Sequence, residues 1–282
     1  MWKLNKPSLL DAQNDIDEAF PNNPRVSIKK TDKDELKLIY DHYDKNNGKS
    51  DNKYKISNVI SSTKATTIKN AYTRTQGHGD LSYIRIALLK TAKYKCAFCG
   101  QNERLTLDHY LPESEYKLVA INRQNLVPIC FNCNLLKNAK PAADFIHVYY
   151  DILPEDQFLI ANIQIQGLAI NITFDIDAKA FDTNRNNPLF FKCLNQIKHI
   201  QLEDRINEIL SGFLAQTFMN DGDIVDNQVL KMTMKVFINN HEKLYGVNDW
   251  RTVVLRALEQ DGNFTIDFLK LYMQTNNEDV FS

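Results

Sequence analysis

Apolar side chains recur every three or four residues in several stretches of the chain, which is the spacing of an amphipathic helix. The helices predicted in the first third of the chain cover 32–43, 56–60, 68–72 and 80–92. Thr31 or Asp32 is the expected N-cap of the first helix and Asp80 that of the last. Residues 1–30 are expected to be irregular, because three prolines interrupt any long helix there.

The second half of the chain predicts a hairpin followed by helices. Apolar and β-branched residues over 158–165 and 168–174 flank a Gln166-Gly167 pair, which is typical of an antiparallel hairpin. Helical spacing then covers 189–218, as one long helix or two, and continues over 227–241, 249–259 and 264–273.

The composition is that of a folded protein. Hydrophobic residues make up 43% of the 282 residues and aromatic residues 10%, enough for a packed core. There is no apolar run near the roughly 20 residues that a membrane span needs. The N-terminus is too charged for a signal peptide, so we expect a cytoplasmic protein without membrane contacts.

The net charge of −1 conceals an uneven distribution. Residues 1–145 carry 23 Lys and Arg against 16 Asp and Glu, whereas residues 146–282 carry 11 against 19. Residues 45–95 hold 11 basic side chains and only two acidic ones. This segment is either a basic face for a polyanion or an ordinary solvated surface, and the composition alone leaves both open.

Four of the five cysteines form two CxxC pairs. Cys96 and Cys99 make the first pair, Cys130 and Cys133 the second, and Cys193 stands alone as an expected core thiol. Two such pairs indicate a tetrahedral zinc site. A redox use of the pairs is the alternative, but a βαβ context for it is lacking. The 30 residues between the pairs exceed the spacer of a simple zinc ribbon, so a further element is inserted there.

The inserted segment contains the candidate chemistry. It predicts a strand over RLTLDH, a second strand in the stretch where QNLVP leads into the second cysteine pair, and a helix that begins at Asn134. Folding around a zinc ion that joins both ends is expected to bring Asp108, His109 and Asn134 together. A histidine with an ordinary pKa near 6.5 is suited to act as a general base at neutral pH.

Residues 96–140 resemble the HNH, or ββα-metal, nucleases that are stapled by four cysteines. The shared pattern is C-x-x-C, D-H-x-x-P and N-L-x-x-x-C-x-x-C-[HN]-x-x-K, and it covers about 45 of the 282 residues. The resemblance implies that Asp108 binds a divalent cation, that His109 is the general base and that Asn125 orients the His109 ring. The second metal ligand of the family is often His, but here it is Asn134, which favours Mg²⁺ or Mn²⁺.

Some of these residues have structural alternatives. The alternative for Asn125 is that its side chain only forms an Asx turn. Asn134 is also a candidate helix N-cap, a role that is compatible with binding a metal ion. His147, just beyond the motif, is expected to pack against it, and His78 is expected in a loop. Three basic residues are candidate contacts for phosphates beside the cleaved one: Arg104, Lys137 and Lys140.

The expected fold is α+β, with a zinc-stapled ββα core between mostly helical flanks and a β-hairpin after the core. We expect a basic N-terminal region over 1–92, the nuclease core over 93–145 and an acidic region over 146–282. The resemblance implies an endonuclease acting on double-stranded DNA, with structural Zn²⁺ and catalytic Mg²⁺ or Mn²⁺. It also implies a place in prokaryotic anti-phage defence, with an ATPase partner or a homo-oligomer. The alternatives are a zinc-stapled nucleic-acid-binding module without catalysis and a nuclease subunit that depends on its ATPase partner.

Overall fold

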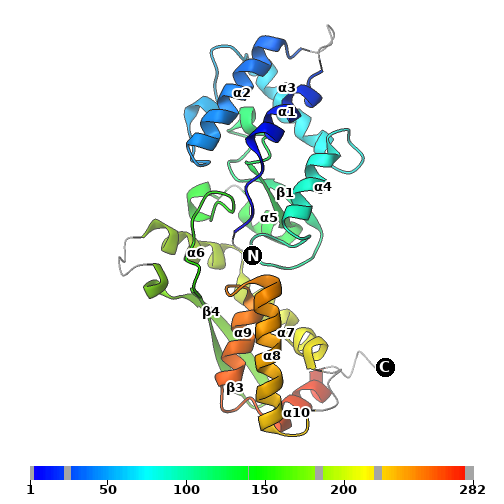
Figure 1. The fold of residues 1–282 in the computed structure, drawn as a ribbon, viewed down its shortest axis with the longest axis vertical. Coiled ribbons are helices and arrows are strands. Elements are labelled where there is room, and N and C mark those ends of the chain that lie inside the picture. The colour runs from blue at the N-terminus through cyan, green and yellow to red at the C-terminus, as the bar shows by residue number, and fades with distance from the viewer. Residues whose placement is uncertain (1–2, 22–26, 139, 182–186, 219–223, 277–282) are drawn as a thin grey trace. The chain divides into compact units, whose positions relative to one another are not determined.

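The chain folds into two compact units with both helices and short antiparallel hairpins (Figure 1). The computed structural model describes residues 3–21, 27–138, 140–181, 187–218 and 224–276. The units are residues 2–152 and 153–282. The mixed helical and β fold is confirmed, whereas the three-part division with boundaries after residues 92 and 145 stays a prediction.

The first unit begins with helices. They are α1 (Leu9–Ala19), α2 (Lys30–Lys45), η1 (Asn52–Tyr54), α3 (Ser62–Asn70), η2 (Ala71–Thr75) and α4 (Ser82–Thr91). The expectation of an irregular start is wrong, because Ser8 accepts a hydrogen bond from the Asp11 amide and caps α1. Pro7 therefore precedes the helix and does not interrupt it.

The ends of the other helices differ from the predicted ends. The helix expected over 56–60 is absent from that described stretch, because the Ser57 hydroxyl accepts from the amides of Val59 and Ile60 and holds a turn. The N-cap of α2 is Lys29, whose amide donates to the Asp32 carboxylate. Asp80 does not cap α4, since its carboxylate is taken up by an ion pair with Arg74.

The two strands and the helix predicted between and after the cysteine pairs are confirmed. They are β1 (Leu105–His109), β2 (Leu126–Cys130) and α5 (Phe131–Lys137), with η3 (Lys117–Val119) between the strands and η4 (Ala142–Asp144) after the helix. The strands are antiparallel and place Asp108 opposite Val127 and His109 opposite Leu126. Helix α5 begins at Phe131 rather than Asn134, because Cys130 is its N-cap.

The N-terminal helices are joined to the outer edge of β1 by two side chains. Tyr72 of η2 donates a hydrogen bond to the Leu107 carbonyl, and Arg85 of α4 donates to the Leu105 carbonyl. A two-stranded sheet leaves such carbonyls unpaired. The helices therefore complete the edge of the strand that ends in Asp108 and His109.

The second unit is a hairpin covered by helices. The elements are β3 (Leu159–Gln166), β4 (Ala169–Ile176), η5 (Ala178–Phe181), α6 (Pro188–His199), α7 (Leu202–Phe218), α8 (Asn227–Tyr245), α9 (Trp250–Gln260) and α10 (Ile266–Asn276). The predicted hairpin is confirmed, and the 189–218 stretch is two helices. Asn207 of α7 both donates to and accepts from the Ile172 backbone and so covers the edge of β4. No helix in the described part of the chain is long and apolar enough to cross a membrane.

Candidate active site

The four paired cysteines form a buried cluster at one end of the ββα core. Their sulfur atoms lie within 4.8 Å of one another. In each pair the backbone amide of the second cysteine donates to the sulfur of the first. The Cys99 amide donates to the Cys96 sulfur and the Cys133 amide to the Cys130 sulfur, both at 3.4 Å. Hydrogen bonds from the neighbouring thiols lower the pKa of Cys130. This set of sulfur donors fits a tetrahedral zinc ion.

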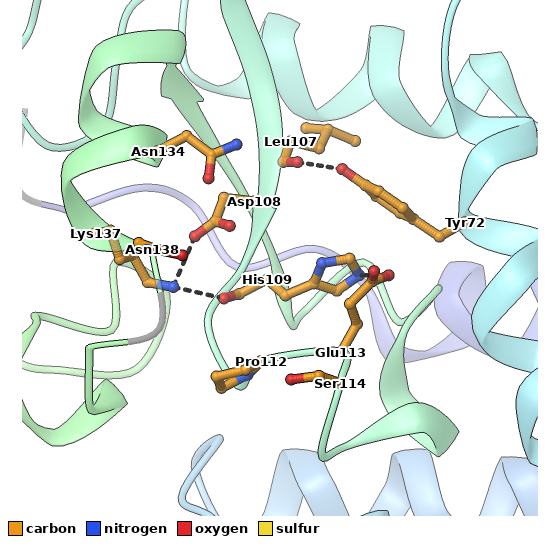
Figure 2. Close-up of a pocket in the computed structure, with 10 residues that line it drawn as sticks. All are labelled: Tyr72, Leu107, Asp108, His109, Pro112, Glu113, Ser114, Asn134, Lys137 and Asn138. Atoms are coloured by element: carbon orange, nitrogen blue, oxygen red, sulfur yellow. Dashed lines mark hydrogen bonds and ion pairs between the residues drawn. The ribbon is translucent and has the colours of Figure 1, made fainter.

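The oxygen donors proposed for a second metal ion face each other across β1 and α5. The Asn134 amide nitrogen donates to the Thr106 hydroxyl at 3.3 Å, which leaves the amide oxygen on the side of Asp108 (Figure 2). Asp108 also pairs with Lys137, with 2.7 Å between the carboxylate oxygen and Nζ. Burial raises the pKa of Asp108, and the Lys137 charge opposes that rise. Two hard oxygen donors fit Mg²⁺ or Mn²⁺ better than a soft metal.

His109 is buried on the opposite face of the strand end. Its Nε2 lies 2.8 Å from the Ala120 carbonyl oxygen, and a carbonyl only accepts, so Nε2 carries the proton. The other nitrogen, Nδ1, lies on the side of the ring away from Glu113 and bears a lone pair (Figure 2). The Tyr72 ring packs against the imidazole, with 4.3 Å between the two ring centroids. Burial is the main cause that lowers the pKa of His109 to about 4, so the ring is neutral at pH 7.

Asn125 holds the loop that follows His109. The amide is fully buried, and its oxygen accepts from the Leu111 amide at 2.8 Å and from the Tyr43 hydroxyl at 3.0 Å. Its nitrogen donates to the carbonyls of Leu111 and Val119. Asn125 thus binds both ends of the loop that carries Ala120 to the His109 ring. The His109 ring forms its hydrogen bond with the Ala120 carbonyl and not with Asn125. A role of Asn125 in orienting the ring therefore stays a prediction.

These groups surround one open cavity of about 360 Å³ (Figure 2). Asp108, His109, Asn134 and Lys137 all line it, together with Tyr72, Leu107, Pro112, Glu113, Ser114 and Asn138. Glu113 lies 3.7 Å from His109 Nε2 and 3.8 Å from the Lys69 ammonium group. The cavity therefore combines an oriented neutral imidazole, two oxygen donors and a buried ammonium group.

The three candidate phosphate contacts differ in their surroundings. Lys137 is buried and directed into the cavity, where Nζ also donates to the His109 carbonyl at 2.8 Å. Lys140 donates to the Leu136 carbonyl at the end of α5. Arg104 is exposed, and its guanidinium forms no ion pair within the described ranges. Contact of any of them with phosphate stays a prediction.

Five of the eleven basic side chains in the segment over 45–95 form ion pairs within the first unit, four of them with acidic residues from outside the segment. The pairs are Lys45 with Asp41, Lys55 with Glu115, Lys64 with Asp32, Lys69 with Glu113 and Arg74 with Asp80. The local charge excess in the sequence therefore overstates the basic charge of this part of the surface.

The cysteine pairs, the Asp-His strand end and the helix with Asn134 occur in the same order as in a known family. Residues 96–140 match the family model of the HNH endonucleases. This segment is an HNH endonuclease domain. The HNH domain supports a nuclease function on nucleic acid, and nucleases with this domain use divalent metals.

Two curated proteins are similar to parts of the chain. The Septu protein PtuB of Bacillus thuringiensis is 33% identical over 57 residues, which are 18% of this chain and 22% of that protein. Protein ea31 of Escherichia phage lambda is 30% identical over 127 residues, which are 41% of this chain and 43% of that protein. The chain thus spans less than half of either relative. No solved structure matches it significantly.

The structure also settles the alternatives for single residues. Asn134 is not an N-cap, since Cys130 has that place. His147 is buried against the ring of Tyr110, with 4.0 Å between the ring centroids, and its Nε2 lies 3.1 Å from the Tyr43 hydroxyl oxygen. His78 is exposed in a turn, and Cys193 is buried in α6. Tyr72, Tyr43, Glu113 and the Ala120 carbonyl were not expected from the sequence, because none belongs to a motif.

Proposed function

We propose that this protein is a metal-dependent endonuclease that hydrolyses phosphodiester bonds in double-stranded DNA. The single observation that carries the proposal is that Asp108, Asn134 and a neutral His109 line one cavity. A module that only binds nucleic acid has no need of an oriented neutral imidazole beside two oxygen donors.

His109 acts as the general base in this proposal. Nδ1 takes a proton from the attacking water, the water oxygen bonds to phosphorus, and the bond from phosphorus to the leaving sugar oxygen breaks. The Ala120 carbonyl accepts a hydrogen bond from Nε2–H and so holds the ring in the tautomer whose Nδ1 is free of a proton. Glu113, 3.7 Å from Nε2, stabilises the cationic ring that results.

Asp108 and the Asn134 oxygen hold the divalent cation, and Lys137 faces the phosphate. When bound, Mg²⁺ or Mn²⁺ supplies charge to the phosphoryl oxygens and to the leaving oxygen. Lys137 already compensates the charge of Asp108 and is directed into the cavity, so its ammonium group is within reach of an anionic phosphate there. The cysteine cluster holds zinc and takes no part in the reaction.

We also propose a role in anti-phage defence, with an ATPase as partner. The relative that is named a Septu protein supports this role. Plating of phages on cells that produce the wild type or His109→Ala tests it: protection is expected only with the wild type, and equal plating on both strains contradicts the role.

Cleavage of supercoiled plasmid by the full chain tests the nuclease proposal. Wild type with Mg²⁺ or Mn²⁺ is expected to nick or linearise the plasmid, and His109→Ala is expected to lose this activity while it keeps its zinc. His78→Ala is the matched control, because His78 is exposed in a turn outside the cavity. Cleavage by His109→Ala at the wild-type rate contradicts the assigned base.

A further inference from the structure

Two lysines lie together on one side of the candidate active site. The ammonium group of Lys69, on α3, is 3.8 Å from the Glu113 carboxylate, which is itself 3.7 Å from His109 Nε2. Glu113 lines the cavity, so Lys69 lies at its rim. In Figure 2, Glu113 and the buried Lys137 lie on opposite sides of the His109 ring. The cavity therefore has one ammonium group on the α5 side and another on the α3 side.

The second lysine reaches α3 from the loop between the two strands of the HNH domain. Lys117, in η3, donates a hydrogen bond to the Thr66 hydroxyl at 3.4 Å. Thr66 is exposed and precedes Lys69 by three residues, so both side chains lie on the same face of the helix. The Thr66 hydroxyl donates its own proton to the Ser62 carbonyl at 3.1 Å. Thr66 thus holds Lys117 beside Lys69, and we call the ammonium groups of these two lysines the α3 subsite.

The α3 subsite has a net positive charge. Residues 52–79, which include α3, contain no Asp or Glu. Lys117 forms no ion pair in the part of the chain that the structure describes. Glu115, two residues before Lys117, is already bound by Lys55 at 2.8 Å. Glu113 offsets the charge of Lys69, and the charge of Lys117 is left for a ligand.

The contact between Lys69 and Glu113 leaves both groups accessible to a ligand. Its length of 3.8 Å exceeds that of a hydrogen bond, and the two side chains are 32% and 34% exposed. An ion pair of this kind contributes little free energy, so a phosphate competes with Glu113 for the lysine.

The ligand that fits two lysines beside this cavity is the phosphate backbone of the cut strand. A DNA strand carries one phosphate for about every 3.4 Å of helix axis, so a strand with one phosphate in the cavity has another just outside it. Lysine ammonium groups bind phosphate as point charges and read no base sequence. On the basis of the proposed function, we propose that Lys69 and Lys117 bind the phosphate next to the cleaved one on the same strand. The cut strand then crosses the cavity from the α5 side to the α3 side.

The test removes charge from the protein and from the DNA in turn. The probe is a duplex that the wild type cuts at one mapped linkage, and two further duplexes carry a neutral methylphosphonate at one or the other flanking linkage. All proteins are the full chain with His109→Ala, so that each duplex stays intact. Fluorescence anisotropy with Mg²⁺ present measures binding over a range of salt concentrations.

Lys69→Gln/Lys117→Gln is expected to bind the unmodified duplex about tenfold more weakly than the His109→Ala parent, with a salt slope smaller by about 2, because two positive charges that contact phosphate are lost. A methylphosphonate at one of the flanking linkages is expected to weaken binding by the parent about tenfold and by this variant less than about twofold, since both changes remove the same contact. Glu113→Gln is expected to bind the unmodified duplex about threefold more tightly, because the charge that competes for Lys69 is gone.

Lys231→Gln/Lys270→Gln is the matched control, because it removes two exposed lysines from α8 and α10 of the second unit. This control is expected to bind all three duplexes as the parent does. Zinc content and circular dichroism confirm that each variant is folded.

Parent-like affinity of Lys69→Gln/Lys117→Gln overturns the α3 subsite, as does an equal loss of affinity in the control variant. A methylphosphonate effect that is as large in Lys69→Gln/Lys117→Gln as in the parent overturns it too, because the lysines then contact another part of the duplex. These results leave the nuclease proposal intact. Failure of the wild type to cut DNA, with zinc and fold intact, instead removes the proposed function together with the subsite.

Discussion

Lys137 has an unusual position for a lysine, since it is 2% exposed and lies inside the candidate site. Its Nζ is 2.7 Å from the Asp108 carboxylate and 2.8 Å from the His109 carbonyl oxygen. A carboxylate with so little access to water needs a compensating charge. The lysine therefore favours the ionised form of Asp108, against the rise in its pKa that burial causes, and holds the end of β1 against α5.

Lys137→Met is expected to lower the free energy of unfolding by about 3 kcal/mol, because the half-buried Asp108 is left without its partner. The double variant Lys137→Met/Asp108→Asn is expected to recover part of this loss, since the uncompensated charge is gone. Urea unfolding of samples with equal zinc content measures the free energy of unfolding of both variants. A double variant no more stable than Lys137→Met contradicts the importance of the pair.

Tyr43→Phe removes the hydroxyl that donates to Asn125 and contacts His147. We expect a loss of about 1 kcal/mol in stability and a roughly tenfold slower cleavage, because the loop behind the His109 ring is held less firmly. Tyr149→Phe is the control, since its buried hydroxyl binds the Leu126 carbonyl at 2.8 Å. It is expected to lose similar stability without the change in rate. Equal rates for Tyr43→Phe and the wild type contradict the positioning role.

At the scale of single residues, the sequence predicts the site residues whose side chains can bind a metal ion or accept a proton. Asp108, His109 and Asn134 lie around one cavity as expected, because their spacing belongs to a recognisable motif. The Ala120 carbonyl has no signal in the sequence, since every residue has a carbonyl and only the loop geometry selects this one. Tyr43 is equally hidden, because its contact with Asn125 joins residues 82 positions apart.

Among the elements, α5 depends most directly on the zinc cluster. Cys130 ends β2 and caps α5, and its sulfur accepts from the Cys133 amide. The helix has only seven residues, too few to be stable alone. Zinc at the cluster is therefore expected to hold the helix that carries Asn134 and Lys137.

Cys130→Ser is expected to lose zinc and the structure of the HNH domain, because the metal supplies much of the folding free energy of such small sites. Cys193→Ser is the control, since this buried cysteine lies in α6 outside the cluster. Atomic absorption is expected to give one zinc per chain for the wild type and for Cys193→Ser. Full zinc in Cys130→Ser contradicts the assignment of the cluster and reopens a redox use of the cysteines.

Element types were more predictable than element ends. The hairpin around Gln166-Gly167 and the helices after it follow from periodicity and turn chemistry, which are local. The errors lie at caps: Ser8 starts a helix after a proline, Ser57 prevents one, and Asp80 is paired with Arg74. Such side chains choose between a cap, a turn and an ion pair according to their neighbours in space.

At the scale of the whole molecule, the HNH domain is part of a larger compact unit. Residues 2–152 form this unit, and Tyr72 and Arg85 from its helices bind the backbone of β1. The charge pattern of the sequence is only a partial guide at this scale, since Lys64 and Lys69 from the basic segment pair with acidic residues outside it. Net charge along a segment does not show which charges meet after folding.

A fragment of residues 2–152 is expected to fold, bind zinc and unfold cooperatively, because the helices complete the edge of β1. A fragment of residues 93–145 lacks Tyr72, Arg85 and Tyr43 and is expected to bind zinc without a cooperative transition. Thermal unfolding followed by circular dichroism measures both. A cooperative transition in the shorter fragment contradicts the structural role of the helices.

The most direct test of the metal-dependent nuclease is the cleavage rate of wild type and Asp108→Ala over a range of Mn²⁺ concentrations, with zinc measured in each sample. Wild type is expected to cleave DNA in proportion to bound Mn²⁺. Asp108→Ala is expected to cleave at least a hundredfold more slowly at every concentration while it keeps one zinc per chain. A wild-type rate in Asp108→Ala, or a rate that does not change with Mn²⁺, contradicts the proposed catalytic site.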